Sequence, residues 1–260
     1  MITSSSNSKV KQVIQLKKKA KARAEAGVFL VEGFKMVEEA INSGIQEVFV
    51  SESREEELLN QPGKVLQTLS YEVVSDKLFS QMSDTVTPQG ILATVRMPEY
   101  SLEAIISRPK GHLVLLENLR DPGNLGTIIR SAEGAGATGV ILSKESADIF
   151  NPKVIRSTMG SIFRVPFCYV EDFQDAMRKI KEHGITLYAA HLKGTKQYEY
   201  FDYSKACGFL IGNEANGLTE ETTRIADCLI RIPMAGQVES LNAAMAASIL
   251  MFEVARQRRL

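Results

Sequence analysis

The chain has 260 residues, of which 44% are hydrophobic and 24% are charged, and its 31 basic and 31 acidic side chains give a formal net charge of zero. This length and composition allow one large domain or two modest domains with packed cores. The longest apolar run, residues 243–252, is far shorter than the ~18 residues that a membrane span needs, and no signal-peptide pattern opens the chain. We therefore expect a globular protein of the cytoplasm.

Three cysteines, Cys168, Cys207 and Cys228, stand far apart in the sequence. An odd number with wide spacings fits neither a disulfide framework nor a zinc site. We expect reduced thiols in the core and no bound metal.

Positive charge is concentrated near the amino terminus, where residues 1–23 carry basic side chains and no acidic one. A concentrated basic segment attracts phosphate backbones, so we predict a basic arm over 1–23 that binds RNA or DNA. A solvated, frayed terminus is the alternative. The seven basic residues are Lys9, Lys11, Lys17, Lys18, Lys19, Lys21 and Arg23.

After this arm, short apolar runs alternate with helical patterns, which predicts a small α/β sandwich over 24–97. Two prolines and a glycine then predict a linker over 98–110, around a short helix. The strand-like runs are 28–33, 47–51, 71–75 and 90–95, and the helical stretches lie around 34–42, 54–60 and 76–82.

A second domain is predicted over 111–260. Its apolar runs are continuous rather than alternating, which is typical of parallel strands that are covered on both faces. We therefore expect an α/β domain built on a doubly covered parallel sheet. The runs are 112–116, 139–142, 164–170, 185–190, 208–212 and 228–232.

The last element is a predicted helix from Ser240 to about Arg258. Leu241, Met245, Ile249 and Phe252 form one stripe, and further apolar residues lie on its other faces. A helix that is apolar nearly all round is buried on several sides. A second subunit would supply that cover, so we predict a homodimer.

Gly134, Gly136 and Gly139 spell the pattern G-x-G-x-x-G. A dinucleotide-binding fingerprint follows a strand and opens a helix, whereas these glycines follow a helical segment and lead into a strand. We expect them to end a helix and to permit a tight turn. The chain also lacks the lysine motif of a P-loop.

Three polar stretches carry the strongest functional signal, because each follows a buried strand, where open α/β sheets hold ligands. They are D-P-G-N-L-G-T-I-I-R-S-A at 121–132, I-G-N-E-A-N-G-L at 211–218 and I-P-M-A-G-Q-V-E-S-L-N at 232–242.

These stretches, in this order, resemble the SpoU (TrmH-like) branch of the SPOUT RNA methyltransferases. The resemblance covers 111–260, and 28–97 is similar to the ribosomal-protein-like substrate-binding domain that precedes it in this family. The resemblance implies a parallel sheet with a C-terminal trefoil knot, a rare exception to unknotted topology. It also implies methyl transfer from S-adenosyl-L-methionine to a ribose 2′-hydroxyl of RNA.

By this resemblance the first stretch supplies Asn124 and Arg130 to the catalytic site. The resemblance leaves Arg130 as a base or as a group that orients the hydroxyl and phosphate. We favour orientation, because a guanidinium holds its proton too tightly to act as a base and its fork suits phosphate geometry. The alternative is a structural ion pair with Glu133.

The other two stretches supply the remaining predicted site residues. The resemblance assigns Glu214, Ser240 and Asn242 to the catalytic site, and Ser240 is also a good N-cap for the last helix. It places the adenosine moiety on the backbone at Gly212, Ile232 and Leu241, with Leu192 and Met234 as apolar walls. Ala243 and Ala244 depart from the Val-Ser found in many family members.

The segment 151–167 carries Lys153, Arg156 and Arg164 near serines and a glycine, which indicates an RNA cradle or a solvated helix face. The expected function is 2′-O-methylation of structured RNA, with ribosomal RNA favoured over transfer RNA by analogy of the first domain. The alternatives are a noncatalytic RNA-binding or ribosome-assembly protein, a transfer RNA 2′-O-methyltransferase and a base methyltransferase.

Overall fold

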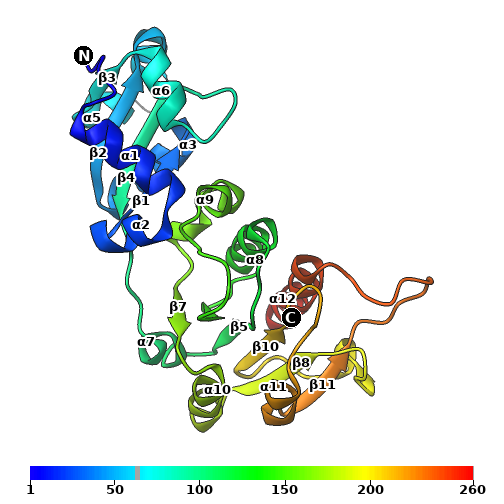
Figure 1. Cartoon of the computed structure of the whole chain (residues 1–260). Coiled ribbons are helices and arrows are strands. Elements are labelled where there is room, and N and C mark those ends of the chain that lie inside the picture. Colours follow the sequence, from blue (N-terminus) through cyan, green and yellow to red (C-terminus); the bar gives the residue numbers. More distant parts are fainter. Residues whose placement is uncertain (62–64, 260) are drawn as a thin grey trace. The chain divides into compact units, whose positions relative to one another are not determined.

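The computed structural model describes residues 1–61 and 65–259, and the chain divides into two compact units (Figure 1). The first unit consists of Met1–Pro98 and Asp148–Phe163, and the second of Glu99–Ala147 and Arg164–Leu260. The sequence predicts neither the return of the chain to the first unit at Asp148 nor its exit at Phe163. Residues 62–64 and 260, which fall within predicted domains, lie outside the described part.

The first unit is built on a four-stranded sheet of order β1-β4-β2-β3, in which only β2 and β3 run parallel. Its strands are β1 (Val28–Glu32), β2 (Ile45–Ser51), β3 (Glu72–Val74) and β4 (Ile91–Arg96). Its helices are α1 (Ser8–Lys18), α2 (Ala20–Ala26), α3 (Phe34–Ala40), α4 (Glu55–Leu59), α5 (Val65–Thr68), α6 (Asp76–Met82) and α9 (Pro152–Thr158), with short 3-10 turns η1 (Ile41–Ser43), η2 (Glu52–Arg54) and η3 (Ser161–Phe163).

The basic segment is part of this unit and not a separate arm. Val10, Val13 and Leu16 lie three residues apart on α1, so they share one face, and all three are buried against α6 and the sheet. Both the separate arm and the frayed terminus are therefore wrong, because the lysines alternate with residues that the core needs.

The segment Asp148–Phe163 completes the other side of the same unit. Phe29 of β1 is fully buried, and its ring lies 4.9 Å from that of Phe150 and 6.1 Å from that of Phe163. Arg23, which is almost fully buried, forms an ion pair with Asp148.

The second unit is built on a seven-stranded sheet of order β7-β6-β5-β10-β8-β11-β9, in which every neighbouring pair is parallel. The predicted parallel sheet is confirmed; the two-residue strand β9 is too short to leave an apolar run. The strands are β5 (His112–Leu116), β6 (Gly139–Ser143), β7 (Phe167–Val170), β8 (Thr186–Ala190), β9 (Lys196–Gln197), β10 (Cys207–Ile211) and β11 (Cys228–Arg231).

Helices cover this sheet on both faces, as its continuously apolar strands require. One group, α8 and α12, packs together and against β5, β6 and β10, while α7 and α10 pack against β6, β7 and β8. The helices are α7 (Leu102–Ile106), α8 (Pro122–Gly134), α10 (Phe173–Glu182), α11 (Glu220–Ile225) and α12 (Ala243–Arg259), with a 3-10 turn η4 (Tyr198–Tyr200). The trefoil knot stays a prediction.

The predicted linker contains α7, whose Ile105 and Ile106 are buried in the core of the second unit. Gly139 opens β6 beside it, and a Cβ there would come 2.3 Å from Cγ2 of Ile105. The helix is thus a structural part of the second unit, which begins at Glu99.

The three glycines of the G-x-G-x-x-G pattern lie where the sequence predicts. Gly134 ends α8, Gly136 has a left-handed φ of 70°, and Gly139 begins β6. They shape a helix-to-strand turn, which excludes a dinucleotide fingerprint.

The last helix begins at Ala243 and not at Ser240. Leu250, Met251 and Val254 are fully buried, whereas Met245 and Phe252 of the predicted apolar stripe are 55% and 44% exposed. Within residues 1–61 and 65–259, none of the helices has the length and apolar character that crossing a membrane requires.

Candidate functional site

The three polar stretches follow β5, β10 and β11 of the parallel sheet, in which β5 and β10 are neighbours and β8 lies between β10 and β11. Ile211 at the end of β10 is level with Leu116 of β5, and Leu210 is level with Ala189 of β8. Ala190 in turn pairs with Ile230 of β11. Because these strands are parallel, the loops that leave their carboxyl ends share one edge of the sheet.

The loop after β10 is shaped by Asn213. Its Nδ2 donates to the backbone oxygen of Asn118 at 2.8 Å, and its backbone exchanges two hydrogen bonds with Gly217, at 2.9 and 3.0 Å. A Cβ on Gly212 would come 2.1 Å from the carbonyl carbon of Gly217. This turn therefore needs glycine at position 212 for close backbone packing.

The carboxylate of Glu214 binds the segment that follows β5. It accepts hydrogen bonds from the backbone N–H groups of Arg120 and Asp121, at 3.2 and 2.9 Å, and from Nδ2 of Asn124 at 3.0 Å. Asp121 caps α8 by accepting from the N–H of Asn124 at 2.7 Å. The second polar stretch thus fixes the first one.

These bonds keep Glu214 ionised. Burial raises the pKa of Glu214, but the bonds from Asn124, Asp121 and Arg120 favour the charged form and together hold the pKa below its usual value. At neutral pH the carboxylate is an acceptor that positions Asn124.

The third stretch joins the same network through Asn242. Its Nδ2 donates to Oδ1 of Asn124 at 2.9 Å, and its Oδ1 accepts from the N–H groups of Ala244 and Met245, at 2.9 and 3.3 Å. Asn242 therefore caps α12 and orients Asn124 at once. Each of the two amides retains one N–H that these bonds do not use.

Arg130 and Ser240 lie outside this network. Arg130 follows Asn124 by six residues, about 9 Å along α8 and about 120° around it, and its side chain is exposed. Glu133, its predicted alternative partner, pairs with Arg164 instead. Among residues 1–61 and 65–259, we find no hydrogen-bond or ion-pair partner for Arg130.

Ser240 is exposed in the loop before α12. Its predicted role as N-cap is wrong, because the helix starts three residues later and Asn242 accepts from the free amides. The sequence does not distinguish these two residues, since both types cap helices well.

The residues predicted to hold the cofactor follow three neighbouring strands of the sheet. Leu192 comes after β8 and is 66% exposed. Gly212 follows β10, and Ile232, Met234 and Leu241 follow β11; these four are half-buried.

Within the described part of the chain, the backbone N–H groups of residues 234–241 make no hydrogen bond. Open backbone donors beside half-buried apolar side chains fit a ligand such as S-adenosyl-L-methionine, which has an apolar adenosine face and several acceptors. In the same described part, no group of three or more His, Cys, Asp or Glu side chains is placed to hold a metal ion.

Sequence reasoning missed Glu117, which lies just beyond β5 and is only 3% exposed. It accepts from the backbone and hydroxyl of Thr219, each at 2.8 Å, and from the hydroxyl of Thr222 at 2.5 Å. It therefore fixes the start of α11 to the end of β5. A polar Glu-Asn pair directly after an apolar run is the sequence signal that could have identified it.

The segment 151–167 divides between the two units and is not one cradle. Arg156 pairs with Asp84 in the first unit, whereas Arg164 pairs with Glu133 in the second. Two of the three cations that the RNA-cradle interpretation needs are therefore paired with carboxylates of the protein.

Comparisons with known families agree with this geometry. Residues 111–252 match the SpoU rRNA Methylase family, and residues 7–93 match the MRM3-like substrate binding domain. The second match includes the helix α1, in agreement with its place in the first unit.

Similar proteins span nearly the whole chain. The 23S rRNA (guanosine(2553)-2'-O)-methyltransferase RlmP of Bacillus subtilis is 33% identical over 255 residues, which cover 97% of this chain and 98% of that protein. The 23S rRNA (uridine(2479)-2'-O)-methyltransferase of Streptomyces viridochromogenes is 33% identical over 91% of this chain and 85% of its own length.

Solved structures show the same fold. The SpoU methyltransferase AviRb from Streptomyces viridochromogenes, in complex with the cofactor AdoMet, has a TM-score of 0.87 at 31% identity and covers 97% of this chain and 98% of its own. The AdoMet-bound rRNA methyltransferase of Sinorhizobium meliloti has a TM-score of 0.85 at 36% identity and covers 98% of this chain and 97% of its own. The chain therefore belongs to the SpoU rRNA methylase family.

Proposed function

We propose that this protein transfers a methyl group from S-adenosyl-L-methionine to a ribose 2′-hydroxyl of ribosomal RNA. Membership in the SpoU family and two relatives named as 23S rRNA 2′-O-methyltransferases support this assignment. The observation that carries it is the network of Asn124, Glu214 and Asn242 at the carboxyl edge of the sheet.

This network supplies positioning. Glu214 and Asn242 determine which way the amide of Asn124 points, because one accepts from its Nδ2 and the other donates to its Oδ1. The unused N–H groups of Asn124 and Asn242 then face an acceptor on the substrate or on the cofactor. S-adenosyl-L-methionine supplies the electrophilic methyl group when it is bound.

Arg130 contacts the RNA in this proposal. Its exposed guanidinium offers five donors, which hold the phosphate beside the reacting ribose and stabilise the negative charge that develops on the 2′-oxygen. Ser240, on the loop before α12, adds a hydroxyl donor to the same site. We assign Arg130 to orientation rather than to proton abstraction, because a guanidinium stays protonated.

The cofactor lies against the loops of β8, β10 and β11. The backbone at Gly212, Ile232 and Leu241 holds the adenosine moiety, and Leu192 and Met234 contact it with apolar surface. The half-buried state of four of these residues and the open amides of 234–241 support this placement.

The protein acts as a homodimer in the cytoplasm, and its first unit binds the RNA. Met245 and Phe252 leave an apolar stripe exposed on α12, and a second copy of the chain would cover it. Light scattering at micromolar concentration tests this assembly, and a strict monomer would exclude it.

A methyl transfer assay tests the function. RNA is prepared from cells that lack the protein and is incubated with the purified chain and S-adenosyl-L-methionine labelled with tritium in the methyl group. We expect label in large ribosomal RNA, and nuclease digestion with mass spectrometry should find it on a ribose. Label in transfer RNA or on a base would select the corresponding alternative enzyme, and binding without label would select a noncatalytic RNA-binding protein.

A further inference from the structure

Four of the seven basic side chains near the amino terminus are used inside the first unit, and among them Lys21 Nζ pairs with Glu25 at 3.8 Å. Lys17 Nζ donates to the backbone oxygens of Gln81 and Ser83, each at 2.7 Å. Lys9 and Arg23 form ion pairs with carboxylates of the same unit. These cations stabilise the fold and are not available to a partner.

Lys11, Lys18 and Lys19 remain for an external partner, and the first two lie within α1 itself. Both are exposed, and neither has a hydrogen-bond or ion-pair partner in the described stretches 1–61 and 65–259. A separation of seven residues puts them on one face of α1, about 10 Å apart. Gln15 lies between them and is exposed, and α1 contains no acidic residue. The outer face of α1 is therefore purely cationic and polar.

The loop of residues 83–90, which follows α6, is fixed at its beginning by Glu32 at the end of β1. The carboxylate accepts hydrogen bonds from the hydroxyls of Ser83 and Thr85 and, at 3.0 Å, from the N–H of Asp84. The same segment receives Lys17 from α1, so the loop begins next to the last turn of that helix.

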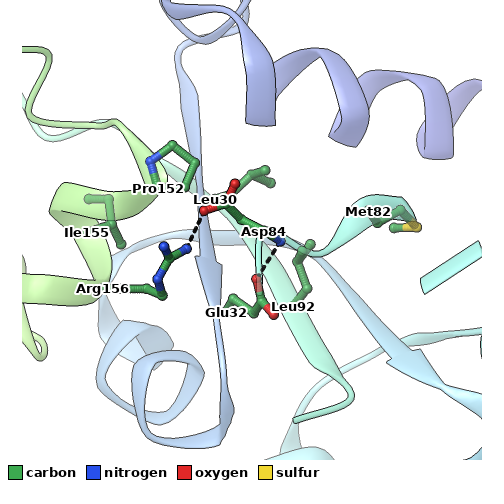
Figure 2. Close-up of a pocket in the computed structure, with 8 residues that line it drawn as sticks. All are labelled: Leu30, Glu32, Met82, Asp84, Leu92, Pro152, Ile155 and Arg156. Atoms are coloured by element: carbon green, nitrogen blue, oxygen red, sulfur yellow. Dashed lines mark hydrogen bonds and ion pairs between the residues drawn. The ribbon is translucent and has the colours of Figure 1, made fainter. Parts of the chain in front are cut away.

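Further contacts hold the loop from beneath and at its far end. Asp84 pairs with Arg156 of α9, and both side chains line a small cavity between α9 and the sheet (Figure 2). At the far end, Gln89 Oε1 accepts from the N–H of Phe34 at 3.0 Å, and Gly90 has a left-handed φ of 84°. The cavity is lined by Leu30, Glu32, Met82, Asp84, Leu92, Pro152, Ile155 and Arg156.

The side chain at the tip of this loop is apolar and exposed to solvent. Val86 is 99% exposed, between Thr85 and Thr87. A loop that is fixed at both ends loses little conformational entropy when it binds a partner, so an exposed valine on it is well prepared for contact.

We infer that the outer face of α1, with Lys11 and Lys18, and the tip of the loop 83–90, with Val86, form one surface that contacts RNA. The lysines contact phosphates, and Val86 packs against an unpaired base in a loop or bulge of the RNA. Uncompensated positive charge selects a polyanion over a protein surface of mixed charge. This inference rests on the proposed function and names the surface by which the first unit recognises its substrate.

Filter binding of the full chain to deproteinised large ribosomal RNA, from cells that lack the protein, tests the inference. The variants are K11Q/K18Q and V86S, and the matched control is K35Q/K205Q, which removes the same charge from two other exposed lysines. K11Q/K18Q should weaken binding roughly tenfold and reduce the slope of log Kd against log salt by about 1.5. V86S should weaken binding roughly threefold and leave the slope unchanged.

All changed side chains are exposed, so each variant should unfold at the wild-type temperature; this is measured first. In methyl transfer both surface variants should raise KM for RNA and keep kcat. If both behave like the control while the wild type binds and methylates the RNA, the inference is wrong and the proposed function stands. If the wild type methylates no RNA, the proposed function is wrong. If the wild type also binds no RNA in the filter assay, the inference is wrong as well.

Discussion

Asn242 is the residue through which the closing helix α12 and the site depend on each other. Replacement by alanine removes two bonds to the first amides of α12 and one bond to Asn124. Loss of an N-cap costs about 1 kcal/mol, and loss of a side-chain hydrogen bond costs about as much. We therefore expect Asn242→Ala to lower the free energy of unfolding of the second unit by about 2 kcal/mol, or about 4–8 °C in Tm.

Asn242→Asp separates the two roles. Its carboxylate still accepts from the amides of Ala244 and Met245, where the positive end of the helix favours it. It cannot donate to Oδ1 of Asn124, and it places a negative charge beside that acceptor. We expect a Tm within about 3 °C of wild type together with a loss of methyl transfer of about tenfold or more.

Calorimetry of the full chain and initial rates at saturating RNA check both variants. The reasoning would be refuted if Asn242→Asp methylated RNA at the wild-type rate. It would be refuted equally if Asn242→Ala unfolded like the wild type, because the cap would then contribute nothing.

Three further expectations follow from other residues. Arg130→Lys should keep less than half of the wild-type methyl transfer, since lysine lacks the bidentate fork; higher activity in the tritium assay would contradict the orienting role. Gly212→Ala should destabilise the second unit by about 3 kcal/mol or more in urea unfolding, because its Cβ would come 2.1 Å from the backbone of Gly217; an unchanged midpoint would show that this turn can relax. Burial, followed by the nearby Arg258, lowers the pKa of His112 from 6.5 to about 4. The unfolded chain therefore binds a proton between these pH values that the folded chain does not, so stability is fully present above pH 6.5 and falls by about 3 kcal/mol as the pH drops to 4. The variant His112→Leu should lose this pH dependence of the free energy of unfolding. If the free energy of the variant falls equally steeply between these pH values, other groups cause the dependence.

The elements of the second unit could be predicted because its strands are short, continuous apolar runs, such as His112–Leu116. The sequence predicts a start for the last helix that is three residues early, because Ser240 and Asn242 cap helices equally well. It predicts an arm in place of α1, because the lysines between Val10, Val13 and Leu16 obscure the helical spacing of these apolar residues.

The candidate site was only partly accessible from the sequence. The polar stretches predicted which loops share an edge of the sheet, since parallel strands bring their carboxyl ends together. They could not show that Asn213 shapes the turn or that Glu117 is buried, because both act on backbone groups more than 90 residues away. The apolar residues of the cofactor loops resemble core residues, so only the family resemblance identified them.

The segment Asp148–Phe163 has a consequence for how the protein can be made and divided. It supplies Phe150 and Phe163 to the first unit, although it is encoded between β6 and β7 of the second sheet. During translation, the first unit cannot complete its core until part of the second has emerged from the ribosome. A fragment that stops at Pro98 would therefore expose Phe29. To exchange the first unit between related genes, both of its coding segments, for Met1–Pro98 and for Asp148–Phe163, would have to be transferred.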